Sequence, residues 1–552
     1  MPSAIRSALM RPPPTPPAGR RSRRSSRTGL PARADAGPAG RLGVPDIRAG
    51  GYRGRAAHTI AVAVTVAALL LAHASVARAS AGSFESSDLL LNQIWSASVL
   101  TATDMVAPGP LTVDAEGQPC AIDLPEVLLD GLVRDRCPYA GDQAVTGLTL
   151  LVSTPSAAPV LRAMILWYAQ NQYADGAIPA TPLDGGEHVF FDYNAYWVDD
   201  LYDYILYTGD LGLAQEVWPN LVALMDVWYP AQAGPDGLLG NPLGPFDYAY
   251  IPRIGTVIAY YNAGYVWALR LAARIADWLG QDDQASAWRA QIAPIAAAFT
   301  PAFWDAKAGA FKDSTVGPVV HPEDGNAFAI LAGLATRRQA RSALDYLTWH
   351  DNEPYGATIA DNDAWDGYPW GDQASQRVYP FMSYFEVLAR YAVGFDQSAL
   401  DLIEREWGNM LAHGPGTMWE DVGAGGTAPI GPDPSWDHGW SSGAAPALTN
   451  EVLGVTPAAP GFSSFNAHPH PSNLTWARGV VPTPHGAITF AWERNGDVFT
   501  ATVNSPVPGT ITLPVAGEIT LDGKELPGQR RPTVEVAPGA HTLVETEART
   551  AR

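Results

Sequence analysis

ESSDLLLNQIWSASVLTATDMV, residues 85–106, indicates the fold class, because its apolar residues recur at helical spacing. Leu90 lies four positions before Ile94, and Leu91 four before Trp95, so their side chains form an apolar stripe along a helix. Similar stripes follow as far as about residue 455, at residues 143–153, 157–173, 194–208, 213–229, 256–280, 283–299, 324–335, 337–349, 372–393, 397–412 and 439–453. The chain therefore predicts twelve helices, with no convincing strand among them.

Long loops between these helices favour a ring over a simple bundle. The loops at 174–193 and 414–438 exceed the 2–8 residues that usually connect bundled helices. They are rich in Gly, Asp and aromatic residues, a mixture typical of loops that carry function. A solenoid would show self-similar sequence repeats, and we find none in this chain. We therefore expect a mainly α fold, an (α/α)6 toroid over residues 81–455.

The pattern changes after about residue 456. Residues 487–526, AITFAWERNGDVFTATVNSPVPGTITLPVAGEITLDGKEL, alternate apolar and polar side chains. The pairs Asn495-Gly496 and Asp522-Gly523 are turn signals between the alternating runs. We expect residues 456–545 to form a small C-terminal antiparallel β-sandwich.

The N-terminal region, residues 1–80, has the pattern of a targeting segment. Residues 1–57 hold 12 Arg and no Lys and predict a disordered, Pro- and Arg-rich lead-in. Residues 58–80 contain a short apolar stretch that ends in the small-residue pattern Ala77-Arg78-Ala79, typical of a cleaved signal. The thirteen residues from Ile60 to Ala72 are too few to span a bilayer, which needs about 20. We favour export to the medium or cell surface. A misassigned start codon would explain the long lead-in, and an uncleaved anchor is the alternative.

Charge and motifs exclude several classes of function. The net charge is −21, and it becomes −32 without residues 1–79, which carry a surplus of 11 positive charges. Such an acidic surface repels nucleic acid and anionic membranes, so we expect neither as a partner. There is no P-loop, no G-x-G-x-x-G after a strand and no H-E-x-x-H, so the sequence predicts no cofactor and no metal.

Two cysteines, Cys120 and Cys137, are the only ones in the chain. In an exported protein they are candidates for a disulfide that braces the loop around Cys137. Two free buried thiols are the alternative. Metal binding would need more ligands than these two.

Three loop motifs concentrate groups that could cleave a glycosidic bond, a reaction that requires two carboxyl groups. They are DGLVRDRCPYAGD (130–142), GPGTMWEDVGAGG (414–426) and SWDHGWSSG (435–443). Taken singly, each has an ordinary explanation: a solvated turn, a carboxylate at a helix start or a structural histidine. Their joint presence on loops of a helical ring, each beside aromatic residues, predicts a glycoside hydrolase whose catalytic domain is the toroid at residues 81–455.

Six motifs resemble a known family. FESSDLLLNQIWSASVLTATDM, DGLVRDRCPYAGD, YWVDDLYDYILYTGD, TMWED, DHGWSSGAAPALTNEVLGV and HPHPSNLTWARGVVPTPHG follow the order and spacing of the bacterial α-L-rhamnosidases of glycoside hydrolase family 78. The resemblance covers roughly residues 84–545. It implies a six-hairpin toroid, a C-terminal β domain, and inverting hydrolysis that releases terminal α-L-rhamnose from a glycoside or polysaccharide.

The resemblance also implies roles for individual residues. Asp135 matches the general acid and Glu420 the general base. Asp135 must therefore hold a proton near neutral pH, which requires burial or nearby carboxylates to raise its pKa. The residues expected to bind substrate are Asp130, Arg134, Tyr139, Asp142, Trp197, Trp419, His438 and Trp440.

Three departures from the family pattern keep other functions open. Asp135 stands where Glu is common, Gly131-Leu132 replaces the usual Cys-Pro pair, and the β-sandwich domains that usually precede the toroid have no counterpart here. The alternatives are a toroid enzyme that acts on another sugar and a non-catalytic carbohydrate-binding relative. A polysaccharide lyase is a weaker alternative, because the acidic motif at 130–142 does not suit its chemistry.

Overall fold

The computed structural model describes residues 81–109, 112, 119–133, 136–182, 188–244, 247–365, 374–430, 434–514, 517–526 and 533–547. The predicted lead-in at 1–57 lies outside these residues, and so does the signal segment at 58–80. No helix within the described part of the chain is both long enough and apolar enough to cross a membrane.

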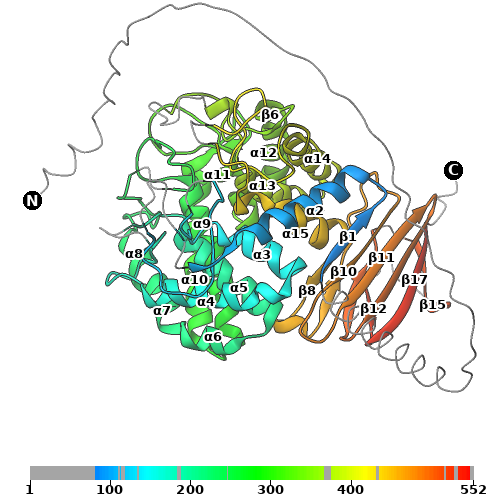
Figure 1. Ribbon diagram of the computed structural model, residues 1–552. Coiled ribbons are helices and arrows are strands. Elements are labelled where there is room, and N and C mark those ends of the chain that lie inside the picture. The colour runs from blue at the N-terminus through cyan, green and yellow to red at the C-terminus, as the bar shows by residue number, and fades with distance from the viewer. Residues whose placement is uncertain are drawn as a thin grey trace, which may run out of the picture. The chain divides into compact units, whose positions relative to one another are not determined.

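Inner helices of the protein form a closed ring (Figure 1). They are α3 (Gln143–Ser153), α5 (Tyr193–Thr208), α9 (Ala259–Trp278), α11 (Glu323–Leu331), α13 (Pro380–Val393) and the short turns η6 (Gly439–Gly443), α15 (Ala444–Ala447) and η7 (Leu448–Val452). Each helix contacts the next, α13 contacts η6, and η6 contacts α3. This closure confirms the predicted (α/α)6 toroid.

Outer helices pack on this ring. They are α2 (Leu89–Asp104), α4 (Ala158–Gln170), α6 (Leu211–Glu216), α7 (Trp218–Ala223), α8 (Tyr229–Ala231), α10 (Asp282–Phe303), α12 (Arg337–His350) and α14 (Asp396–His413). The sequence explains which helices are inner. α3 has no charged residue and every one of its residues is buried, whereas α12 carries charges on one face and buries only four small or apolar residues.

Three predicted helices differ from the observed ones. The helix predicted at 213–229 is divided into α6, α7, a π turn at Leu224–Trp228 and α8. The helix predicted at 439–453 consists of the short turns η6, α15 and η7. The helix predicted at 372–393 begins only at Pro380, because proline fits the first helical turn and disfavours a helical residue before it.

The inner helices begin at one end of the ring, and hydrogen bonds link their first turns. Tyr193 at the start of α5 donates to Asp142, which precedes α3. Tyr260 at the start of α9 donates to Asp192, which precedes α5. In addition to these hydrogen bonds, the ring of Trp440 in η6 stacks on the ring of Phe381 at the start of α13. Because helix N-termini favour negative charge, this end of the ring can hold many carboxylates.

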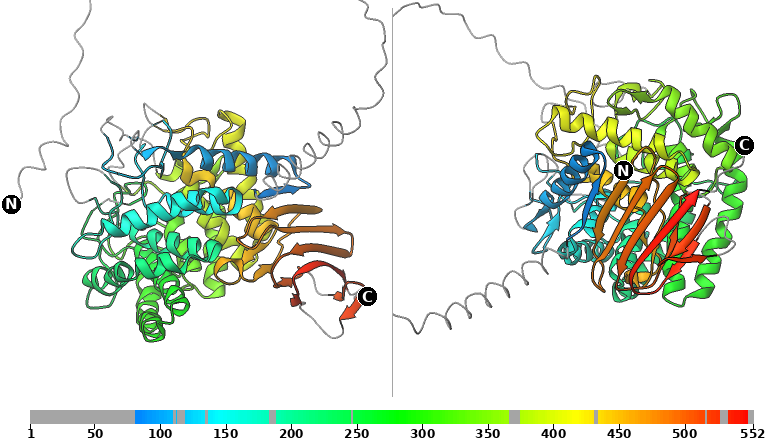
Figure 2. Two further views of the ribbon diagram at one scale, coloured as in Figure 1. Left: turned by 60° about the horizontal axis from the view of Figure 1, so that its bottom comes forward. Right: turned by 90° about the vertical axis from the view of Figure 1, so that its right-hand side faces the viewer.

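The C-terminal domain consists of two sheets, as expected for a sandwich (Figure 2). One sheet has the order β1-β10-β11-β12-β17-β14-β15, built from β1 (Ser83–Ser86), β10 (Trp476–Val481), β11 (Ile488–Asn495), β12 (Val498–Ser505), β17 (Gly539–Glu547), β14 (Gly517–Leu521) and β15 (Lys524–Leu526). The other has the order β16-β13-β9-β8, built from β16 (Thr533–Val536), β13 (Gly509–Thr512), β9 (Phe465–Ala467) and β8 (Val455–Pro457). Asp522 and Gly523, a predicted turn, both have positive φ, as a tight hairpin requires.

The sheets correct three expectations from the sequence. β1 was expected in the helical domain, but it pairs with β10, so the segment just before α2 completes the C-terminal sheet. The sandwich contains one parallel pair, between β9 and β13. Two-residue hairpins also interrupt the helical part: β2 (Val106–Ala107) with β3 (Val127–Leu128), β4 (Trp304–Asp305) with β5 (Ala310–Phe311), and β6 (Asn352–Glu353) with β7 (Gly356–Ala357). Strands this short show no period in the sequence.

Polar contacts join the sandwich to the helices. The indole of Trp492 in β11 donates to the carbonyl of Val452 at the end of the ring. His470, on the loop before β10, lies between two acids, with Nδ1 at 3.1 Å from Asp396 of α14 and Nε2 at 3.5 Å from Glu451 of η7. Both acids raise the pKa of His470, although burial opposes this effect. The sandwich is therefore attached partly through a titratable group.

Candidate active site

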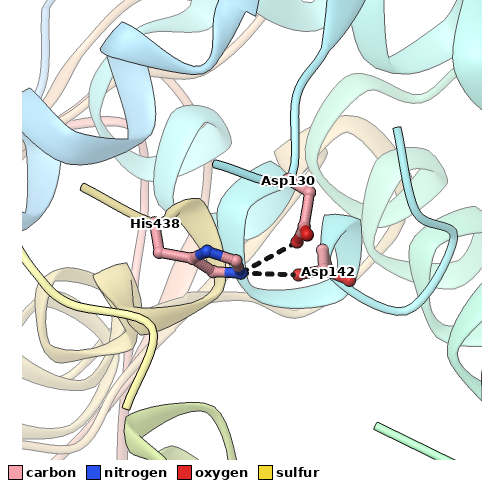
Figure 3. A group of neighbouring side chains, drawn as sticks. All are labelled: Asp130, Asp142 and His438. Carbon is pink, nitrogen blue, oxygen red and sulfur yellow. Dashed lines mark ion pairs between the residues drawn. The ribbon is translucent and has the colours of Figure 1, made fainter. Parts of the chain in front are cut away.

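A histidine and two aspartates form the centre of the site (Figure 3). Nε2 of His438 lies 2.8 Å from Oδ1 of Asp130 and 3.3 Å from Oδ1 of Asp142. All three residues are buried. The backbone fixes their approach, because Gly131 and His438 form an antiparallel bridge, and the amide of Gly439 donates to the carbonyl of Asp130. Two of the predicted motifs, at residues 130–142 and 435–443, therefore meet.

Asp142 occupies the N-cap position of α3 but does not cap the helix with its side chain. Its Oδ2 instead accepts a hydrogen bond of 2.9 Å from the hydroxyl of Tyr193, while its Oδ1 faces His438. Burial and the neighbouring charge of Asp130 raise the pKa of Asp142 well above its usual value, although His438 opposes this shift. The pair of aspartates can therefore retain a proton at pH values where isolated carboxyl groups are ionised.

Glu420 approaches the same histidine from the other side. Its Oε2 lies 3.9 Å from Nδ1 of His438, and its side chain is 14% exposed. The main chain holds Glu420 in place, since its amide donates to Ser435 and its carbonyl accepts from the indole of Trp440. Ser435 Oγ also lies 3.2 Å from Nδ1 of His438. One imidazole thus connects the predicted base with the predicted sugar-binding aspartates.

Arg134 and the predicted acid, Asp135, lie outside the residues that the structure describes. The residues on both sides of them are anchored at the site. Leu132 donates through its amide to Asp437. Cys137 accepts from the amide of Asp130 and forms a disulfide with Cys120.

Two aromatic residues predicted to bind the sugar are buried elsewhere, which corrects the sequence-based assignment. Trp197 is fully buried, and its indole donates to the carbonyl of Ile165 in the outer helix α4. Trp419 is also fully buried and packs edge-on against Trp436, whereas the adjacent Glu420 reaches His438. Neither ring is available to a ligand.

Trp440 and His438 lie at the site, the latter in a different role from the predicted one. Trp440 is mostly buried, stacks on Phe381 with ring centres 5.0 Å apart, and lies 4.7 Å from the ring of His438. His438 was predicted to contact the sugar, but only 1% of its side chain is exposed and carboxylates occupy Nε2. The structure therefore makes it a link between acids rather than an open sugar ligand.

An aromatic wall adjoins the acids, and the sequence identified only part of it. The half-buried ring of Tyr139 lies 6.2 Å from that of Phe190, which lies 5.3 Å from that of Tyr250. Tyr193 contacts both Tyr139 and Phe190 and reaches Asp142 through its hydroxyl. Tyr250 has φ of +52°, a strained conformation that tends to mark functional sites. Phe190 falls within the loop 174–193 that was expected to carry function.

A buried arginine, missed in the sequence, organises the neighbouring loops. Nε of Arg253 lies 2.8 Å from Asp247, and its Nη1 lies 2.6 Å from Asp313. A third ion pair joins it to Asp324 in the first turn of α11. These acids are scattered over nearly 80 residues without a motif, so no local pattern could have identified the cluster.

Asp130, Asp142 and His438 are also the one group in the described part of the chain whose ligand atoms could surround a metal ion. Those atoms all lie within 4.8 Å of one another. The close approach of Nε2 of His438 to both aspartates already accounts for the arrangement.

Comparisons with known proteins bear on this site. Residues 123–353 match the family described as the bacterial alpha-L-rhamnosidase 6 hairpin glycosidase domain, and residues 454–525 match the bacterial alpha-L-rhamnosidase C-terminal domain. No curated protein matches the chain at a significant level.

Solved structures share the fold. A family 78 rhamnosidase of Bacillus sp. GL1 is 23% identical with a TM-score of 0.61, over 79% of this chain and 43% of its own. An α-L-rhamnosidase of Streptomyces avermitilis complexed with L-rhamnose is 16% identical with a TM-score of 0.64. The match covers 84% of this chain and 42% of that enzyme. A rhamnosidase of Klebsiella oxytoca with rhamnose bound is 20% identical with a TM-score of 0.53. The match covers 67% of this chain and 64% of that enzyme. The chain thus spans less than half the length of the first two.

Proposed function

We propose that the chain is a glycoside hydrolase that releases terminal α-L-rhamnose, because residues 123–353 and 454–525 match two domain families of bacterial α-L-rhamnosidases. The observation that carries the proposal is the convergence of Glu420 with Asp130 and Asp142 around His438, at the end of the ring where the inner helices begin. Two of the solved structures of similar fold contain rhamnose, which supports the choice of sugar.

The proposed chemistry is inversion by a water molecule. Glu420 removes a proton from water as it attacks the anomeric carbon, and an acid protonates the leaving oxygen. Asp135 is our assignment for that acid. Asp142 is a second candidate, because burial and Asp130 favour its protonated form. Tyr139 and the rest of the aromatic wall would receive the apolar 6-methyl group of rhamnose.

Hydrolysis of p-nitrophenyl α-L-rhamnoside tests the activity and the roles. Glu420→Gln is expected to reduce kcat by at least about 10²-fold, the usual effect of losing a general base. Glu518→Gln, on an exposed strand of the sandwich, is the matched control. An inactive parent protein would reject the reaction, and an active Glu420→Gln would reject the base.

Asp135→Asn and Asp142→Asn separate the two candidate acids. A true acid is needed most for poor leaving groups, so its variant should lose much more activity on an alkyl rhamnoside than on the nitrophenyl one. Proton NMR of the first product gives the stereochemistry: β-L-rhamnose supports inversion, and α-L-rhamnose rejects it.

Export is also part of the proposal. It rests on the apolar segment and the small-residue pattern within residues 58–80. N-terminal sequencing of the protein from the culture medium should give a start close to residue 80. Retention of the full chain in the cell would reject export.

A further inference from the structure

An open groove crosses the exposed face of the larger sheet, and none of the active-site residues lines it. Figure 2 (right) shows the strands of this sheet. It has a volume of about 650 Å³ and crosses β1, β10, β11, β12 and β17. Strands in a sheet lie about 4.8 Å apart, so five strands give a length of roughly 19 Å. This is long enough for several sugar rings in a chain.

The floor of the groove consists of two rows of residues in register. One row joins, from strand to strand, Glu85, Arg478, Ala491, Thr502 and Thr542. The next row joins Ser83, Val480, Thr489, Asn504 and Ala540. Side chains in the middle of both rows are short, so a ligand can come close to the sheet.

The chemistry of this floor suits a neutral, hydroxyl-rich ligand. The hydroxyls of Thr489 and Thr502 each offer one donor and two acceptor positions, and the amide of Asn504 offers both kinds as well. All three side chains are exposed. Sugar hydroxyls also donate and accept, so they can pair with every one of these groups.

Charged side chains along the groove are already paired. Nε of Arg478 donates to Glu85 at 2.8 Å, and Nδ1 of His541 lies 2.9 Å from Asp522. An anionic polymer would require unpaired cations here. A protein partner would require large aromatic or aliphatic anchors at the centre, where this floor has Ala and Thr. The charge balance and the lining thus favour a neutral glycan.

We propose that this groove is a second carbohydrate site, which binds a neutral rhamnose-containing polysaccharide and holds it on the enzyme. The choice of rhamnose rests on the proposed function, whereas the neutral glycan class follows from the groove itself. The groove requires no catalytic group, and it acts by retaining polymer near the active site.

Affinity electrophoresis in gels containing a soluble, neutral α-L-rhamnan tests the proposal. Glu420→Gln is used as the background, so that the polymer is not cut. The groove variant combines Thr489→Val, Thr502→Val and Asn504→Ala, which remove polar groups while the two Val substitutions keep the branched shape. Thr512→Val with Thr533→Val, on the other sheet, is the matched control.

The parent and the control should be retarded by the rhamnan, and the groove variant should bind at least about tenfold more weakly. Equal retardation of the groove variant, or no retardation of the parent, would overturn the proposal. So would a dimer in sedimentation that the groove variant abolishes without any change in rhamnan binding, because the face would then bind a second copy of the chain.

Nitrophenyl rhamnoside hydrolysis by the same groove substitutions in the active protein separates this proposal from the proposed function. The small substrate does not need the groove, so its turnover should be unchanged. Groove-dependent rhamnan binding by a protein without hydrolase activity would reject the proposed function alone.

Discussion

Replacing His438 by glutamine tests whether one imidazole holds the acids of the site together. The side chain is 1% exposed, and its Nε2 faces Asp130 at 2.8 Å and Asp142 at 3.3 Å, whose side chains are 10% and 3% exposed. Removing one partner of a buried ion pair costs about 3–5 kcal/mol, because the other charge is left without compensation. We therefore expect His438→Gln to lower the free energy of unfolding by about 3 kcal/mol.

The loss of stability should depend on pH in a definite direction. Burial and Asp130 raise the pKa of Asp142, and His438 lowers it, so the variant raises this pKa further. A carboxyl group whose pKa is raised by folding destabilises the native state increasingly as the pH climbs from its unfolded value, about 3.9, through its folded value. The stability difference between parent and variant should therefore be larger at pH 8 than at pH 5.

Urea unfolding followed by tryptophan fluorescence at both pH values measures this difference. His485→Gln, at an exposed loop of the sandwich, is the matched control and should change stability by less than about 0.5 kcal/mol. A loss for His438→Gln below about 1 kcal/mol, or one that is larger at pH 5, would refute the reasoning.

Four further variants test other parts of the structure. Replacing Cys120 and Cys137 by serine should cost about 3 kcal/mol, the loop-closure value for a 17-residue separation, and should abolish any effect of dithiothreitol on urea unfolding. His470→Gln should destabilise the protein more at pH 5.5 than at pH 9, because a histidine whose pKa is raised by folding stabilises below about pH 6.5 and loses this effect as the pH rises through its folded value. Trp197→Phe should lower the free energy of unfolding by about 1–3 kcal/mol without changing KM for the aryl rhamnoside, because this ring is fully buried. Tyr250→Ala should raise KM for the same substrate by about 2–10-fold, because this ring belongs to the aromatic wall.

The cysteine, His470 and Trp197 variants each have a control or a contrary result. The single serine variants should match the double one, and a parent that dithiothreitol does not weaken would count against the disulfide. His413→Gln, at an exposed helix end, should show no such pH dependence, and an equal loss at both pH values for His470→Gln would reject the ionic link. A change in KM for Trp197→Phe would show that this ring reaches the substrate after all.

Helices and the small β domain could be predicted from the sequence because both depend on local patterns. The i, i+4 stripes of α2 and the alternation in β11 arise from neighbours within one element. Motif order also predicted that acids at 130–142 and Glu420 belong to one site, and the contacts through His438 bring Asp130, Asp142 and Glu420 together. Asp135 remains a prediction.

What the sequence by itself determined was therefore the type of each element and the chemical groups available to the site. Only the tertiary structure decided which groups face one another: Trp440 beside His438 but Trp197 against an outer helix, Phe190 and Tyr250 beside Tyr139, and β1 in the far sheet. The physical reason is that periodicity reports a face of one helix or strand. Closure of the ring brings together residues hundreds of positions apart, and no local spacing encodes that contact.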